Sequence, residues 1–145
     1  MAKFNFRFST LLHAKEILEK KIKEEISIIN KEIESLKQQL KLIYEERLKN
    51  QREMIEKPLK VSEFQSAKMY DSILERQTLV IDRKIEMLKL NKEQKQIELV
   101  EKKKEVRSIE ILRENQLEDF LLDERKQELK ELNEIAIRNF SGNQN

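Results

Sequence analysis

Apolar residues recur along the first part of the chain in alternating steps of three and four. They are Ile26, Ile29, Ile33, Leu36, Leu40 and Ile43. This spacing is that of the a and d positions of a left-handed coiled coil, so it predicts a first long helix over residues 10–56. Upstream, the apolar positions step by four throughout: Ala14, Leu18, Ile22 and Ile26. Steps of four predict a stutter that locally unwinds the supercoil.

A second long helix is predicted over residues 63–139. Its seam positions near the first helix are Ala67, Tyr70, Leu74, Ile81, Ile85 and Leu88. A wholly polar stretch, residues 91–96, then weakens the seam, which resumes less regularly at Leu99, Val106, Ile109 and Leu112. Such an interruption costs stability and often sets the register, or it marks a place where a hairpin flexes.

The two helices are separated by the only proline in the chain, Pro58. Proline disfavours a helical conformation in the residue before it, so the first helix should end at or before Lys57. Ser62 followed by Gln65 has the spacing of a capping box, which predicts Ser62 as the N-cap of the second helix. We therefore expect a hairpin bend at residues 57–62. The only glycine, Gly142, predicts a C-terminal helix stop and a tail of residues 140–145.

The second helix is predicted to be much longer than the first. At 1.5 Å per residue the helices span roughly 115 Å and roughly 70 Å, so residue 10 should lie beside residues 108–110. The last thirty or so residues of the second helix then have no partner in the hairpin. They are nevertheless amphipathic, with apolar positions Leu117, Phe120, Leu121, Leu129, Leu132, Ile135, Ala136 and Phe140. A lone helix of this kind is marginal unless its apolar stripe is covered.

Residues 1–9 are predicted to form an aromatic N-terminal tail containing Phe4, Phe6 and Phe8. The phenylalanines alternate with polar residues as in a β-strand, but no second strand is available for pairing. We therefore expect a flexible tail that leads into the first helix. Three aromatic side chains without a core of their own are apolar surface that requires a partner. Either this surface binds another protein, or the tail folds back on the second helix.

Composition supports long helices and argues against a compact globular domain. Charged residues make up 40% of the chain and apolar residues 38%, with one Gly, one Pro and no Cys. The fold class is therefore predicted as all-α: an elongated antiparallel two-helix coiled coil with a longer second helix. No apolar run reaches the roughly 18 residues of a membrane span, and no secretory signal is visible, so a cytoplasmic location is expected.

No constellation of residues indicates catalysis, and we expect a protein that is not an enzyme and binds no metal or cofactor. The single histidine, His13, has no fixed carboxylate or nucleophile nearby, and no glycine-rich loop could hold a phosphate. The run Lys102-Lys103-Lys104 is flanked by acidic residues. Its side chains point to different sides of a helix, which argues against a nucleic-acid partner.

The chain has three local features, in residues 3–12, at Tyr70, Leu74 and Ile81, and in residues 123–136, through which it resembles the FliJ family of the flagellar type III export apparatus. The opening, residues 3–12, has aromatics and Arg7 before a Leu-Leu helix entry. Tyr70, Leu74 and Ile81 resemble the aromatic-then-leucine pattern at the start of the family's second helix. The charged ending, residues 123–136, closes on a Leu-x-Glu-Ile-Ala element.

The resemblance implies a coiled-coil stalk, similar to the central stalk of rotary ATPases. Such a stalk binds and activates the hexameric flagellar export ATPase, connects it to the export-gate membrane protein and takes part in the cycling of export chaperones. It would lie at the inner face of the cell membrane through the export apparatus. The implied ATPase-contact residues are Arg7, Phe8, Leu11, Leu12, Leu117, Phe120, Leu121, Leu129, Leu132 and Ile135. The implied export-gate contacts are Gln39, Ile43, Tyr70, Leu74, Gln77 and Ile81.

Two of the gate candidates, Leu74 and Ile81, also fit the intramolecular seam, where they would be core and not contact. Glu46 stands where the resemblance leads us to expect an aromatic. Two other functions remain open. A generic cytoplasmic coiled-coil scaffold or chaperone, including a dimeric one, would self-associate through the same seam. Peripheral membrane binding through the phenylalanines of the tail ranks lower, because basic residues are not concentrated beside them.

Overall fold

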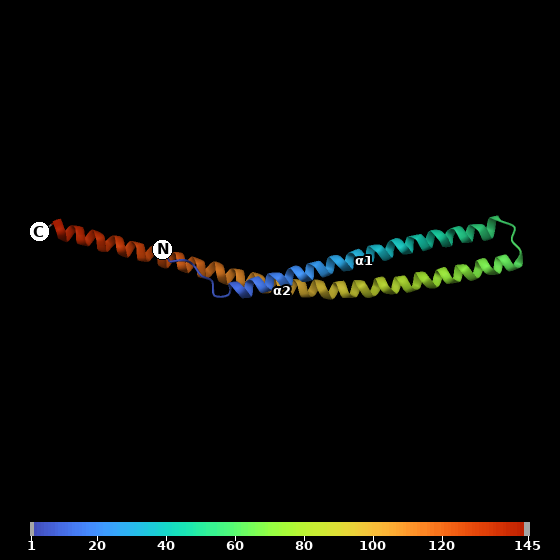
Figure 1. The fold of residues 1–145 in the computed structure, drawn as a ribbon, viewed down its shortest axis with the longest axis horizontal. Coiled ribbons are helices and arrows are strands. Elements are labelled where there is room, and N and C mark those ends of the chain that lie inside the picture. Colours follow the sequence, from blue (N-terminus) through green and yellow to red (C-terminus); the bar gives the residue numbers. More distant parts are fainter. Residues whose placement is uncertain (1, 144–145) are drawn as a thin grey trace. The chain divides into compact units, whose positions relative to one another are not determined.

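The computed structural model describes residues 2–143, which form two α-helices. Helix α1 (Ser9–Glu56) and helix α2 (Val61–Asn143) are joined by residues 57–60 (Figure 1). The helices contact each other, the second is longer, and no strand occurs among the described residues. The predicted all-α helical hairpin is therefore confirmed. The chain divides into two compact units. We call residues 20–100 the bend unit, and residues 1–19 with 101–145 the terminal unit.

The core of the bend unit is the predicted seam. Its buried members are Ile29, Ile33, Ile81 and Ile85, with Leu36, Leu40, Ile43 and Leu88 packed against them. Ion pairs at the two ends of this unit join Glu25 to Lys95 at 2.8 Å and Arg47 to Asp71 at 2.9 Å. Residue numbers rise along α1 as they fall along α2, so the two helices are antiparallel.

One seam position of the bend unit is polar. Thr78 is 5% exposed and lies between the seam residues Leu74 and Ile81, where the apolar pattern has a gap. Its hydroxyl donates a hydrogen bond of 2.6 Å to the carbonyl of Glu75 in the same helix. Because this local bond satisfies the hydroxyl, a threonine is tolerated inside the seam.

The predicted stutter near the start of α1 is wrong. Steps of three and four continue through this region, at Leu12, Lys15, Glu19, Ile22 and Ile26, all of which are buried or half-buried. Ala14 and Leu18 are exposed instead. The apolar pattern was misleading because two seam positions carry charged side chains. The Lys15 ammonium lies 2.9 Å from the Glu105 carboxylate, so its burial is compensated by an ion pair within the terminal unit.

The polar stretch of α2, residues 91–96, also has charged side chains at seam positions. Lys92 and Lys95 are half-buried although they lie in the polar stretch, and the ammonium of Lys95 pairs with Glu25. The seam therefore continues through this region with charged side chains in place of apolar ones. Long lysine stems cover apolar surface while their charged ends reach a carboxylate at the edge.

The bend is shorter than predicted, because α2 begins at Val61 and not after Ser62. The Glu63 carboxylate accepts a hydrogen bond of 3.3 Å from the backbone N–H of Lys60. The N–H of Phe64 in turn donates to the carbonyl of Lys60 at 2.9 Å. In a capping box the side chain at position N3 accepts a hydrogen bond from the backbone N–H of the N-cap residue. Glu63 and Lys60 take these two positions, so Ser62 lies inside the first turn. The predicted Ser62 cap is wrong.

The C-terminal end of α2 also differs from the expectation. The helix continues to Asn143 instead of ending near residue 139, and Gly142 does not adopt a positive φ. Glycine permits a left-handed helix stop but does not impose one, and here no contact turns the chain away from the helix. The predicted C-terminal tail is thus helical as far as the structure describes it, and its last two residues lie outside the described residues.

In the terminal unit, the aromatic tail folds back on α2. Phe6 is 5% exposed and forms a buried cluster with Leu12 and Val106. Phe4, Phe8 and Ile109 pack against this cluster. The fold-back alternative is therefore the one that the structure shows.

Candidate partner-binding surfaces

All ten predicted ATPase-contact residues lie in the terminal unit, but they are not equally accessible. Leu12 is buried beneath the tail at 8% exposure, and Phe120 packs against Phe4 with ring centroids 5.5 Å apart. Phe8 is half-buried, and the guanidinium of Arg7 lies 5.8 Å from the centre of its ring. The tail thus occupies part of the surface that the resemblance assigns to a partner.

The remaining candidates on α2 form an uncovered apolar stripe. Leu121, Leu129, Leu132 and Ile135 are between 50% and 61% exposed, and Leu117 is 36% exposed. Leu11 on α1 is 44% exposed. Further exposed apolar residues on this part of α2, which were not predicted to belong to a site, include Leu122, Ile137 and Phe140. Large apolar side chains that are exposed in this number form a surface available for a partner.

Four of the six gate candidates meet in the bend unit. Gln39 and Ile43 from α1, with Gln77 and Ile81 from α2, line one open hollow of about 470 Å³. Ile81 is itself 8% exposed and contributes mainly to the seam. Leu74 is 5% exposed, so it is core, which is the alternative that the seam spacing had left open.

Tyr70, a further accessible gate candidate, explains the departure at Glu46. The Tyr70 hydroxyl donates a hydrogen bond of 3.2 Å to the Glu46 carboxylate across the two helices. Partial burial, together with the nearby Glu46 charge, raises the pKa of Tyr70. An acceptor at position 46 therefore serves the phenol of Tyr70 directly, where an aromatic would only stack.

A polar network next to the bend fixes the register of the two helices. The Arg47 guanidinium donates hydrogen bonds of 2.9 Å and 3.4 Å to the two oxygens of Asp71, and Gln51 donates to Asp71 at 3.2 Å. Asn50 donates to the backbone carbonyl of Ala67 at 2.9 Å. The hydrogen bond from Arg47 is the main reason that the pKa of Asp71 is lowered.

The hollow also contains residues that the sequence analysis did not assign to a site. Ile73, Arg76 and Val80 line it on α2. Ile73 and Val80 are 46% and 50% exposed. Ile73 and Val80 are seven residues apart, and each directly precedes a seam residue. This repeat could have revealed them in the sequence, but the stronger apolar pattern of the seam obscures it.

Within residues 2–143, no group of three or more His, Cys, Asp or Glu side chains is arranged to hold a metal ion. His13 is exposed on α1. No helix in this range is long and apolar enough to cross a membrane.

Two antiparallel helices that expose an apolar stripe in one unit and an apolar hollow in the other define a helical hairpin of the coiled-coil class. A comparison with protein-family models gives the family. The model described as Flagellar FliJ protein matches residues 4–145, nearly the whole chain. The chain therefore belongs to the FliJ family and is a flagellar protein related to export. No curated protein and no solved structure matches it.

Proposed function

We propose that this protein is a coiled-coil stalk that binds and activates the hexameric flagellar export ATPase and links it to the export gate. The observation that carries the proposal is the uncovered apolar stripe on α2 in the terminal unit of a FliJ-family chain. Burying a large apolar side chain contributes about 1.5–3 kcal/mol, so four half-exposed leucine and isoleucine side chains offer substantial binding free energy.

Activation would be mechanical. In the terminal unit α1 begins at Ser9, and α2 continues past its contacts with the tail as a single helix. A single off-centre helix inside a six-fold ring contacts the six ATPase subunits unequally. Because a ligand shifts an equilibrium only through differential contacts, unequal contacts bias the nucleotide states of the subunits.

The gate contact would use the bend unit, where Gln39, Ile43 and Gln77 line one hollow and Tyr70 lies partly exposed. Two further parts of the proposal rest on membership of the FliJ family. They are a role in export-chaperone cycling and a cytoplasmic location, in which the export apparatus holds the protein at the membrane.

The test is the hydrolysis rate and hexamer content of the cognate export ATPase with and without this protein. Stimulation should occur with the intact chain and should be lost in the double variant Leu129→Asp, Leu132→Asp. Both side chains are more than half exposed, so the variant should melt at nearly the same temperature as the parent. Leu42→Asp on α1, at a position 65% exposed in the other unit, is the matched control and should stimulate normally.

No stimulation by excess intact protein would remove the stalk proposal. The scaffold alternative would then be preferred, and sedimentation would test it. A stalk should sediment as a monomer of 17.5 kDa, whereas a scaffold of the dimeric kind should self-associate.

A further inference from the structure

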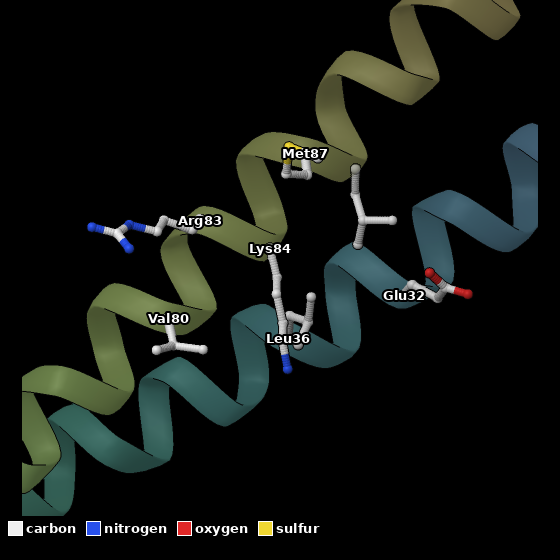
Figure 2. A pocket seen from close by; sticks show the side chains of 7 residues that line it. Glu32, Leu36, Val80, Arg83, Lys84 and Met87 are labelled. Atoms are coloured by element: carbon white, nitrogen blue, oxygen red, sulfur yellow. The ribbon is translucent and has the colours of Figure 1, made fainter.

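The hollow that contains the gate candidates continues along the bend unit. A second hollow of about 540 Å³ is lined by Leu36, Val80, Lys84 and Met87 (Figure 2). Both hollows are lined by Val80, so they form one groove between α1 and α2, which we call the Val80 groove. Neither the length of this groove nor the charge of its lining was predicted from the sequence.

A second apolar stripe on α2 forms one wall of this groove. Ile73, Val80 and Met87 recur every seven residues and are 46%, 50% and 69% exposed. Each precedes a seam position of α2 by one residue, which places the stripe about 100° around the helix from the seam. Helix α2 therefore has two adjacent heptad stripes. One packs against α1, and the other is uncovered.

These dimensions fit a third helix better than an extended peptide. From Ile73 to Met87 the stripe covers about 21 Å, or four helical turns, and its anchors repeat at the period of a coiled coil. An extended peptide needs a strand edge to satisfy its backbone groups, and the walls of the groove are helices whose backbone bonds are already made. A helix satisfies its own backbone groups and needs only side-chain contacts.

The charges around the groove are unevenly distributed. The α2 wall carries Arg76, Arg83 and Lys84, whereas the α1 wall carries Glu32. Lys84 extends from α2 toward Leu36 of α1, and Arg83 points away from α1 at the outer edge (Figure 2). Among the described residues, no carboxylate pairs with any of these three cations. Acidic side chains of an occupant would find them available.

We propose that the Val80 groove binds an amphipathic α-helix of a partner protein, which packs there as a third helix and carries acidic side chains on the flank that faces α2. The inference rests on the gate-contact part of the proposed function, because Gln39, Ile43 and Gln77 line the same groove. It is independent of the ATPase contact, which lies in the other unit.

The probe is a pair of labelled three-heptad helical peptides that share one leucine seam. One carries Glu on a single flank and Gln on the other, and its twin carries Lys in place of Glu. Because a helix can enter the groove in either direction, the charged flank can always face α2. Fluorescence anisotropy with the intact chain should show the Glu peptide binding about tenfold or more tightly than the Lys peptide. Three exposed ion pairs near the middle of their usual range of strength supply this factor.

Two matched variants locate the binding site. Val80→Asp places a charge in the groove and should weaken the Glu peptide more than about tenfold. Leu79→Asp changes the neighbouring residue, which is 54% exposed and lines neither hollow, and should leave binding unchanged. Melting temperatures of both variants show whether each is folded. In the double variant Arg83→Glu, Lys84→Glu the preference should invert in favour of the Lys peptide.

Three results would overturn the inference. The first is equal affinity of the two peptides, or no binding by either. The second is equal loss of binding in the Val80 and Leu79 variants. The third is concentration-dependent self-association of the intact chain that Val80→Asp abolishes, because a second copy would then occupy the groove. The Leu129 and Leu132 variant tests the ATPase contact separately, so the two proposals fail independently.

Discussion

Replacing Phe6 by alanine should open the N-terminal tail without unfolding the helices. Phe6 is 5% exposed, and its ring packs edge-on against Phe8 with centroids 5.9 Å apart. Burying a phenylalanine contributes about 1.5–3 kcal/mol, and an aromatic pair contributes about 0.5–1.5 kcal/mol more. Since the alanine retains some contact, we expect Phe6→Ala to cost the closed tail about 2–3 kcal/mol.

The backbone provides a reporter for this opening. The N–H of Ser9 donates a hydrogen bond of 3.2 Å to the carbonyl of Phe6, and we expect this turn to open once Phe6 is no longer held against α2. A loss of about 2–3 kcal/mol increases the open population about 30- to 150-fold, because each 1.4 kcal/mol is a factor of ten. Hydrogen exchange at Ser9 should accelerate by that factor, since exchange of a protected amide follows the local opening equilibrium.

The control is Phe64→Ala at the start of α2. Phe64 is 43% exposed and its ring lies 5.9 Å from the Lys68 ammonium, so the same truncation there should leave Ser9 exchange unchanged. Unchanged exchange at Ser9 in Phe6→Ala would refute the reasoning, because burial of Phe6 would then not hold the tail. An equal acceleration of hydrogen exchange throughout the bend unit would also refute the reasoning, because the tail and the seam would then open together.

Two further predictions concern the bend unit. Leu40→Asp puts a carboxylate among the seam residues and should destabilise the protein by about 2–4 kcal/mol in urea denaturation, whereas Glu34→Lys on the exposed face should change stability by less than about 0.5 kcal/mol. Equal losses in both would mean that the seam register is wrong. Because the Arg47 hydrogen bond lowers the pKa of Asp71 below its ordinary 3.8, the stability that the pair contributes is present above that value and is lost as the pH falls through the lower, folded-state pKa. Asp71→Asn should remove this acid dependence from thermal melts, and an unchanged acid limb would assign it to other carboxylates.

The folded tail limits which of the predicted ATPase-contact residues are accessible to a partner. Leu12 is buried beneath the tail and Phe120 is half-buried against Phe4, so a partner has full access to them only if the tail is displaced. Leu121, Leu129 and Leu132 need no such change, because they are already exposed. The exposed set is therefore the better target for binding studies, and the effect of Phe6→Ala on ATPase stimulation would show whether the covered set is used as well.

The apolar pattern alone determined the two helices and the core of the hairpin. Seam residues such as Ile33 and Ile81 were predictable because burial of large apolar side chains outweighs every other local preference, and their period is that of a coiled coil. The single proline similarly determined where the chain reverses, because the sequence has no other proline and its one glycine lies near the C-terminus.

Only the tertiary structure decided which charged and polar residues join the seam. Lys15 occupies a seam position because it pairs with a carboxylate on α2, whereas the hydroxyl of Thr78 is satisfied by a backbone carbonyl of its own helix. The pattern of one helix contains no information about partners on the other. For the same reason the sequence left the position of Phe6 open, and it did not reveal the groove at Val80. Both depend on what α2 presents after the seam has formed, and a side chain that is apolar in sequence becomes core or binding surface only when the second helix either covers it or leaves it exposed.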